Sequence, residues 1–134
     1  LFNTINDIER VGDHADNIAE LSMYFIEKDL TFSEESIKDI NTMYEKVMKT
    51  YEMSLQSMRE GSSELALKVV KMEEQVDIIE RSCRSAHIYR LNNSMCNPEA
   101  GIIFLDLLSN LERISDHASN IAKAVIDAKG SISA

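Results

Sequence analysis

Apolar and small residues recur every three or four positions through four long segments of this chain. In the first segment, about residues 1–27, the recurring set is Ile8, Val11, Gly12, Ala15, Ile18, Ala19, Ser22, Phe25 and Ile26. The same intervals continue through about residues 33–60, 63–93 and 98–128. Such spacing gathers side chains on one face of an α helix. The pattern therefore predicts four amphipathic helices of about 27 to 31 residues, each roughly 40 to 46 Å long.

The residues at the ends of these segments are those that begin and end helices. Ser33 and Ser62 are suited to the N-cap position, where a side-chain oxygen accepts from the first free backbone N–H groups. Gly61 supplies a left-handed residue at a helix C-terminus, and Asn97 followed by Pro98 gives a cap with proline at the first helical position. Short connections between long helices make neighbours antiparallel. The predicted fold is all-α, an antiparallel bundle of four long helices.

The amino-acid composition agrees with an all-helical fold. The 134 residues suffice for one domain with a single core. They include four Gly, one Pro and no Trp, and helix interiors exclude Gly and Pro. The net charge of −9 argues against a nucleic-acid partner, because binding phosphates takes clustered Lys and Arg. Such a charge favours cations or basic protein surfaces instead.

The sequence carries no pattern typical of export or of membrane insertion. Its two cysteines, Cys83 and Cys96, form no disulfide framework, which favours a reducing, cytosolic setting. No run reaches the ~18 apolar residues of a membrane-spanning helix, so we expect this segment to be soluble. The sequence begins at Leu1, already inside a helical pattern. We expect it to be a piece of a longer protein.

One phrase of the sequence occurs twice. Residues 9–19 read ERVGDHADNIA and residues 112–122 read ERISDHASNIA, so eight of eleven positions are identical at an offset of 103. A repeat at fixed offset indicates a duplicated structural unit. The shared letters include Glu, Arg, Asp, His and Asn, which points to chemistry as well as packing.

Carboxylates are paired at helical spacing in three places. The pairs, each one turn apart, are Glu9 with Asp13, Glu73 with Asp77, and Glu112 with Asp116. Like charges at this spacing destabilise a helix by roughly 0.2 to 0.5 kcal/mol per pair, so a compensating partner is expected. Clustered carboxylates bind hard cations such as Mg, Mn or Ca, and hold iron or zinc where several carboxylates bridge. The alternative is a solvated acidic face balanced by nearby Arg and Lys side chains.

Polar residues of the repeated phrase are candidates for supporting such a site. They are His14, His117, Asn17, Asn120, Arg10 and Arg113. For the two histidines the alternative is a hydrogen-bonded packing role, and for the two arginines it is pairing with neighbouring acids or contact with phosphate. Cys83 and His87 are also one turn apart. Because Cys83 lies on the predicted core face and no second pair of soft ligands accompanies it, we predict no soft-metal site there.

These motifs resemble the PhoU-like proteins, six-helix molecules built from two three-helix repeats. Residues 9–20 and their echo resemble the family signature, and residues 61–77 resemble the second helix of such a repeat. The resemblance implies that residues 1–28 are the last helix of an incomplete first repeat. It also implies that residues 33–129 are a complete second repeat.

In that family, acidic pairs on the second and third helices of a repeat bind multinuclear metal clusters, often of iron or zinc. Carried over by position, the complete site would use Glu73, Asp77, Glu112 and Asp116. Glu9 and Asp13 match the same motif, but the helix that would face them is absent from this sequence. The resemblance therefore implies metal first at the second copy of the phrase.

The resemblance also implies an accessory or regulatory role in phosphate transport and not an enzyme. Residues 96–117 look most like the cytoplasmic tail of bacterial sodium/phosphate cotransporter family membrane proteins. That would place the segment on the cytoplasmic side of the cell membrane, with the membrane portion of the same polypeptide as its partner. The alternative is a stand-alone PhoU-type negative regulator of the phosphate-starvation response, acting between a phosphate transporter and a sensor kinase.

A di-metal carboxylate enzyme is the remaining alternative for the acidic motifs. Carboxylate-bridged di-iron oxidases are also helical bundles, but they use Glu-x-x-His pairs, and the sequence has none.

The first predicted helix lacks the other helices of its repeat. Its apolar face must nevertheless be buried. We expect this helix either to complete a four-helix bundle within one chain or to exchange into a homodimer.

Overall fold

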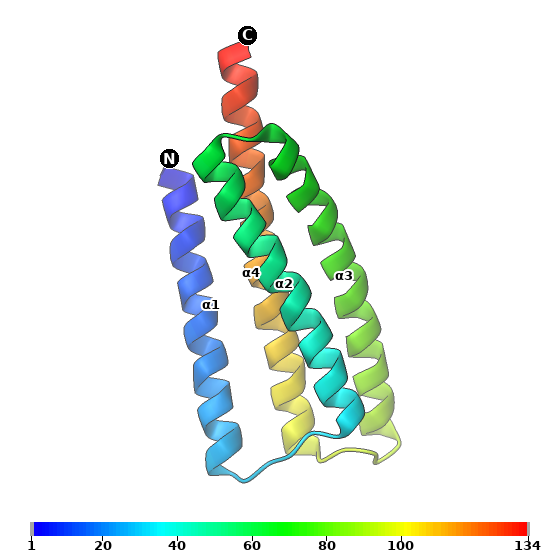
Figure 1. The fold of residues 1–134 in the computed structure, drawn as a ribbon. Helices are drawn as coiled ribbons and strands as arrows, with labels where there is room; N and C mark the ends of the chain where they lie inside the picture. Colours follow the sequence, from blue (N-terminus) through cyan, green and yellow to red (C-terminus); the bar gives the residue numbers. More distant parts are fainter. Residues whose placement is uncertain (1, 134) are drawn as a thin grey trace.

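The chain folds into four long helices that run alternately up and down (Figure 1). The structure is a computed structural model that describes residues 2–133, with side chains through residue 130. The helices are α1 (Phe2–Glu27), α2 (Glu34–Glu60), α3 (Ser63–Asn92) and α4 (Pro98–Ser133), and residues 2–133 contain no strand. The predicted all-α antiparallel bundle is confirmed.

The helix boundaries follow the capping residues of the sequence. The side chains of Ser33 and Ser62 each accept a hydrogen bond from the backbone N–H three residues on, at 3.2 and 3.1 Å. Gly61 adopts the left-handed conformation, with φ of +61°, where L residues with a side chain are strained. The predicted start at Leu1 lies outside the described residues. At the other end α4 continues to Ser133, five residues beyond the predicted end near 128.

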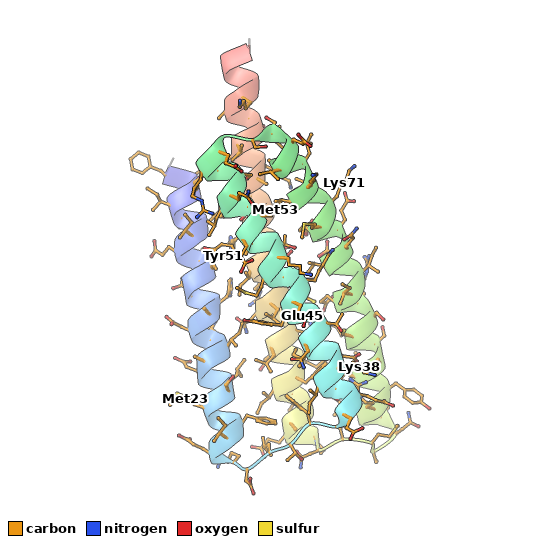
Figure 2. The ribbon with its side chains drawn as sticks, viewed as in Figure 1. Met23, Lys38, Glu45, Tyr51, Met53 and Lys71 are labelled. Carbon is orange, nitrogen blue, oxygen red and sulfur yellow. The ribbon has the colours of Figure 1, made fainter. Side chains whose placement is uncertain are left out.

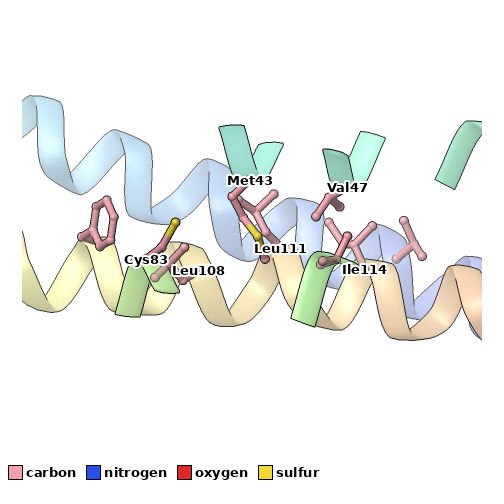
Figure 3. Close-up of a cluster of buried hydrophobic side chains, with 9 residues drawn as sticks. Met43, Val47, Cys83, Leu108, Leu111 and Ile114 are labelled. Carbon is pink, nitrogen blue, oxygen red and sulfur yellow. The ribbon is translucent and has the colours of Figure 1, made fainter. Parts of the chain in front are cut away.

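The hydrophobic core lies between α2, α3 and α4. Figure 3 shows its central side chains, which are Met43 and Val47 of α2, Cys83 of α3, and Leu108, Leu111 and Ile114 of α4. Val11 of α1, Val76 of α3 and Phe104 of α4 complete the cluster. Burial is the main cause that raises the pKa of the Cys83 thiol from 9.0 to about 11, so this cysteine packs as a small apolar side chain.

Helix α1 is the outer helix of the bundle and packs on α4. Over the described residues, its backbone lies close to that of α4 and apart from those of α2 and α3. Its buried and half-buried residues toward the bundle are Thr4, Asp7, Val11, His14, Ile18, Leu21 and Phe25. These positions alternate by three and four residues, which is the spacing of an antiparallel helix seam.

A second row of apolar and small residues on α1 is exposed. We call it the open row; it comprises Ile5, Ile8, Gly12, Ala15, Ala19, Ser22 and Ile26. Six of the seven residues 103 positions later in α4, from Leu108 to Val125, are buried against the rest of the bundle, and the seventh, Lys129, is exposed. The sequence pattern predicted burial of the whole apolar face of the first helix, and the structure buries only one side of it. Figure 2 shows Met23, close to the open row, directed away from the bundle.

None of the four helices, within the part of the chain that the structure describes, has the length and apolarity of a membrane span.

Candidate functional site

Carboxylates from α3 and α4 meet across the interface of these two helices. Glu73 and Asp77 lie one turn apart on α3, and Asp116 approaches them from the antiparallel α4. One carboxylate oxygen of each residue lies within 4.8 Å of the other two. Glu73 and Asp77 are half-buried and Asp116 is exposed, so the cluster is open to solvent on one side. The structure thus brings together three of the four carboxylates predicted for the complete site.

The crowding of these carboxylates changes the protonation of Glu73. Burial, a hydrogen bond with Asp116 and the charge of Asp77 together raise the pKa of Glu73 from 4.5 to about 7. Two carboxyl groups can share a hydrogen bond only if one of them carries a proton. Without a cation, the cluster therefore retains a proton up to near-neutral pH.

The fourth predicted carboxylate, Glu112, pairs with Glu80, which lies on the acidic face of the third helix but was not among the predicted ligands. Burial and then the charge of Glu80 raise the pKa of Glu112 from 4.5 to about 7, with Asp116, Asp77 and a hydrogen bond to Glu80 adding to the effect. Glu80 is buried and its carboxylate accepts from Arg84 Nε at 2.5 Å. The acidic surface thus continues from the three-carboxylate cluster to a Glu112–Glu80 pair that Arg84 partly neutralises.

Arg84 is held in place by a second contact. Its Nη2 group donates to Ser109 Oγ on α4 at 2.9 Å. Arg84 therefore bridges α3 and α4 beside the acidic residues. Because its guanidinium is always charged, it compensates Glu80 in every protonation state of the site.

The residues present fit a hard or borderline cation. Glu73, Asp77 and Asp116 offer oxygen ligands from two helices. A metal role for Glu112 stays a prediction. Ser119, one turn beyond Asp116, has a buried hydroxyl with no hydrogen-bond partner among the described residues. This donor set suits Mg, Mn or Ca, and bridging carboxylates also suit iron or zinc.

The first copy of the phrase does not join this site. Glu9 and Asp13 are exposed on α1, and the described part of α1 does not pack against α3. Arg10 and Arg113 are exposed too, and within residues 2–130 they form no ion pair or hydrogen bond. A metal role for Glu9 and Asp13 stays a prediction.

The histidines and asparagines of the phrase lie at the α1–α4 interface. Asn110 Oδ1 lies 3.2 Å from His14 Nδ1 and accepts from Asn17 Nδ2 at the same distance. In the same way, Asp7 Oδ1 lies 2.9 Å from His117 Nδ1 and accepts from Asn120 at 3.3 Å. No hydrogen bond among the described residues joins these side chains to the acidic cluster. Both histidines therefore take the hydrogen-bonded packing role that was the alternative for them, here at the α1–α4 interface. Their support of a metal site stays a prediction.

His87 and Cys83 are turned to separate partners. His87 Nδ1 accepts from Arg90 at 2.9 Å, and burial followed by the charge of Arg90 lowers the pKa of His87 from 6.5 to about 4. The Cys83 thiol donates to the backbone carbonyl of Asp39 at 3.8 Å. His87 also stacks on Phe104, with ring centroids 4.0 Å apart. Both side chains therefore serve the core.

Two polar residues of these networks, Asp7 and Asn110, were missed from the sequence. Glu80 lies three residues after Asp77, and this spacing places it on the same acidic face as Glu73 and Asp77, although it was not among the predicted ligands. Asp7 and Asn110 each stand seven residues before a histidine of the phrase, at the same offset of 103. Equivalent positions of the repeat therefore make equivalent hydrogen bonds even where the residues differ, as Asp7 and Asn110 do.

Comparison with known proteins assigns the chain to a family. Residues 40–125 match the PhoU domain, and this stretch contains all five acidic residues of the α3–α4 interface. The chain is 28% identical to the phosphate-specific transport system accessory protein PhoU homolog 1 of Thermotoga maritima. The matched stretch of 121 residues covers 90% of the chain and 51% of that protein.

A second relative gives the same picture. The phosphate-specific transport system accessory protein PhoU homolog of Pseudomonas aeruginosa is 29% identical over 129 residues, covering 94% of the chain and 51% of that protein. The chain thus spans about half the length of the curated relatives it matches. No solved structure matches it. On the domain match, which covers most of the chain, this protein belongs to the PhoU domain family.

Proposed function

We propose that this chain is an accessory and regulatory module of phosphate transport, with no catalytic reaction of its own. The observation that carries the proposal is the PhoU domain match over residues 40–125. The names of both relatives describe accessory proteins of a phosphate-specific transport system. The net charge of −9 suits a role with cations or basic surfaces.

We also propose the domain organisation that the repeated phrase implies. Residues 1–28 are the last helix of an incomplete first repeat, and residues 33–129 form a complete second repeat. The open row supports this assignment, because six of its seven α4 equivalents, those from Leu108 to Val125, are buried within the bundle. A helix pair placed like α2 and α3 would cover the open row in the same way.

The acidic cluster is the proposed metal site of the module. Glu73, Asp77 and Asp116 would hold iron or zinc, or else Mg, Mn or Ca, and Glu112 would join after losing its proton. A bound cluster supplies positive charge that can bind phosphate oxygens or clamp α3 against α4. Arg84 is ion-paired with Glu80, so Glu80 would keep a partner when Glu112 turns toward the cation.

For the cellular setting we propose the cytoplasmic tail of a sodium-dependent phosphate cotransporter family protein. Its partner would be the membrane portion of the same polypeptide, and the module would lie at the cytoplasmic face of the membrane. The support is the resemblance of residues 96–117 to such tails. A stand-alone PhoU-type negative regulator, working with a phosphate transporter and a sensor kinase, is the second candidate, and the names of the two relatives favour it.

Phosphate uptake in cells tests the proposal. Cells lacking their own transporters would express the full-length protein, either intact or with Glu73→Gln and Asp116→Asn, and labelled phosphate uptake would be measured in sodium and in choline medium. We expect sodium-dependent uptake whose control by external phosphate is lost in the double variant. Unregulated uptake in both forms, with equal rates in both media, would count against the tail assignment.

The di-metal enzyme alternative has its own test. The purified chain would be loaded with ferrous iron and its oxygen consumption measured. The accessory role predicts at most one stoichiometric oxidation of the added iron, and repeated turnover would overturn it.

A further inference from the structure

The buried hydroxyl of Ser119 lies on α4, one turn beyond Asp116, which is the α4 member of the three-carboxylate cluster. Ser119 is only 3% exposed, and its Oγ atom has no hydrogen-bond partner among the described residues. A buried hydroxyl costs free energy until something bonds it. A group that bonds this oxygen would remove that cost.

The register between α3 and α4 shows what lies opposite Ser119. Successive pairs that join the two antiparallel helices are Arg84 with Ser109, Glu80 with Glu112, and Asp77 with Asp116. Each step moves back three or four residues along α3 and forward three or four along α4. The next step places Glu73 opposite Ser119. Glu73 also forms a hydrogen bond with Asp116, so it lies over the turn of α4 that runs from Asp116 to Ser119.

Ser119 and Asp116 bound the cluster on opposite sides. Asp116 is exposed and Ser119 is buried, so the hydroxyl belongs to the inner side of the site. The residue 103 positions before Ser119 is Asp16, so both copies of the phrase carry a side-chain oxygen at this place. A neutral hydroxyl avoids the cost of taking one more carboxylate charge out of water.

We propose that Ser119 Oγ is a ligand of the cation held by Glu73, Asp77 and Asp116, and that it closes the site on its buried side. This inference rests on the metal site of the proposed function. Three carboxylates and one neutral hydroxyl make an all-oxygen donor set, which is the chemistry of hard divalent cations such as Mg, Mn or Ca. The cation would also give the buried hydroxyl its missing partner.

Manganese titration of the full 134-residue chain tests the ligand. Free Mn²⁺ would be measured by electron paramagnetic resonance at about pH 8, above the pKa of about 7 of Glu73. We expect Ser119→Ala to weaken Mn²⁺ binding by at least about tenfold, the scale on which supporting groups at metal sites act. Ser115→Ala is the matched control and should leave binding unchanged, because Ser115 is likewise a buried serine of α4 whose hydroxyl has no partner among the described residues.

A purely structural role for Ser119 predicts a different result. In chelator, Ser119→Ala removes an unbonded buried hydroxyl, so we expect Tm to stay equal or to rise. Weaker Mn²⁺ binding by a chain of undiminished stability therefore reports a lost ligand and not a damaged fold.

A cysteine variant gives a spectroscopic signature of the same contact. In Ser119→Cys loaded with Co²⁺, we expect ultraviolet sulfur-to-cobalt charge-transfer absorption, because a thiolate would take the place of the hydroxyl. Ser115→Cys and the unaltered chain, which keeps the free thiols of Cys83 and Cys96, supply the baseline.

The outcomes separate this inference from the proposed function. An unaltered chain that binds no Mn²⁺ would overturn both the ligand role of Ser119 and the metal site itself. Mn²⁺ binding that Ser119→Ala leaves unchanged would overturn the role of Ser119 alone, and so would a Ser119→Cys spectrum that matches that of Ser115→Cys. If Ser119→Ala does not fold, the cobalt spectra decide.

Discussion

The imidazole rings of His14 and His117 stack on each other, with centroids 5.5 Å apart and 23° between their planes. They are the same residue of the repeated phrase in its two copies. Antiparallel helices related by a two-fold axis bring equivalent residues face to face, and this pair marks that axis between α1 and α4. The hydrogen bonds of the interface obey the same relation, since His14 faces Asn110 while His117 faces Asp7.

The Asp7 contact gives the first prediction. Asp7→Ala leaves His117 and Asn120 without their shared acceptor, so we expect the free energy of unfolding to fall by about 1 kcal/mol. Asn6→Ala removes an exposed neighbour that makes no described hydrogen bond and serves as the control. Urea unfolding of both variants measures the difference. Equal stabilities would show that the interface gains nothing from these bonds.

Two glycines should respond to alanine in opposite directions. A Cβ atom at Gly12, on the open row, meets nothing within 4 Å, so Gly12→Ala should stabilise the chain by about 0.5 to 1 kcal/mol through helix propensity. At Gly101 the same atom would lie 2.5 Å from Leu91 Cδ2 and 3.2 Å from the buried His87 Nε2. Gly101→Ala should therefore lower Tm. A rise in Tm for both would contradict the described packing of α3 on α4.

Arg84 gives a prediction about the buried acid of the site. Arg84→Ala leaves the buried Glu80 without its cation. We expect the free energy of unfolding to fall by about 1 to 3 kcal/mol, which is less than for a fully buried ion pair because Arg84 is partly exposed. Arg81→Ala, an exposed change on the same helix, is the control and should cost less than about 0.5 kcal/mol. Thermal or urea unfolding near pH 7 distinguishes the two, and similar costs would refute a stabilising role for Arg84.

The raised pKa values of Glu73 and Glu112 predict how stability changes with pH. Both rise from 4.5 to about 7, so the folded, metal-free chain binds more protons than the unfolded chain between these values. The contribution of these two groups to the free energy of unfolding is fully present below about pH 4.5. It is lost as pH rises through about 7, by at most ~1.4 kcal/mol per pH unit for each group.

Urea unfolding in chelator between pH 5 and pH 8 checks this dependence. Glu73→Gln should flatten the decline, because the amide cannot ionise. Glu74→Gln, on the exposed side of the same helix, should leave it unchanged. A chain whose stability rises with pH over this range, or a Glu73→Gln variant with an unaltered slope, would contradict the assignment.

Much of the fold could be predicted from the sequence, because the signals were local. Helical spacing, the serine caps and Gly61 place the ends of α2 and α3 within a residue or so of the structure. The burial of α1 could not be predicted in the same way. The row that is covered includes the polar residues Thr4, Asp7 and His14, so apolar spacing alone does not tell which side of α1 faces another helix. The structure covers only the row facing α4.

The candidate site was predictable in its ligands but not in their pairing. The i, i+4 spacing placed Glu73 and Asp77 on one face of the third helix and Asp116 on the acidic face of the fourth. The structure brings these three carboxylates together. Helical spacing alone could not tell that Glu112 would turn to Glu80, because that depends on the register between α3 and α4. A packing role for the histidines could be predicted, but their partners could not: each histidine pairs with a residue that stands seven positions before the other histidine, on the opposite helix.

Metal analysis of the purified chain shows whether the acidic cluster binds a metal. The untagged chain, prepared without chelators, would be loaded with iron or zinc, desalted and measured by inductively coupled plasma mass spectrometry beside a Glu73→Gln, Asp116→Asn variant. We expect metal in stoichiometric amount in the unaltered chain and its loss in the variant, with circular dichroism confirming that both are folded. A folded, unaltered chain that retains no metal, or a variant that retains as much, would contradict this expectation.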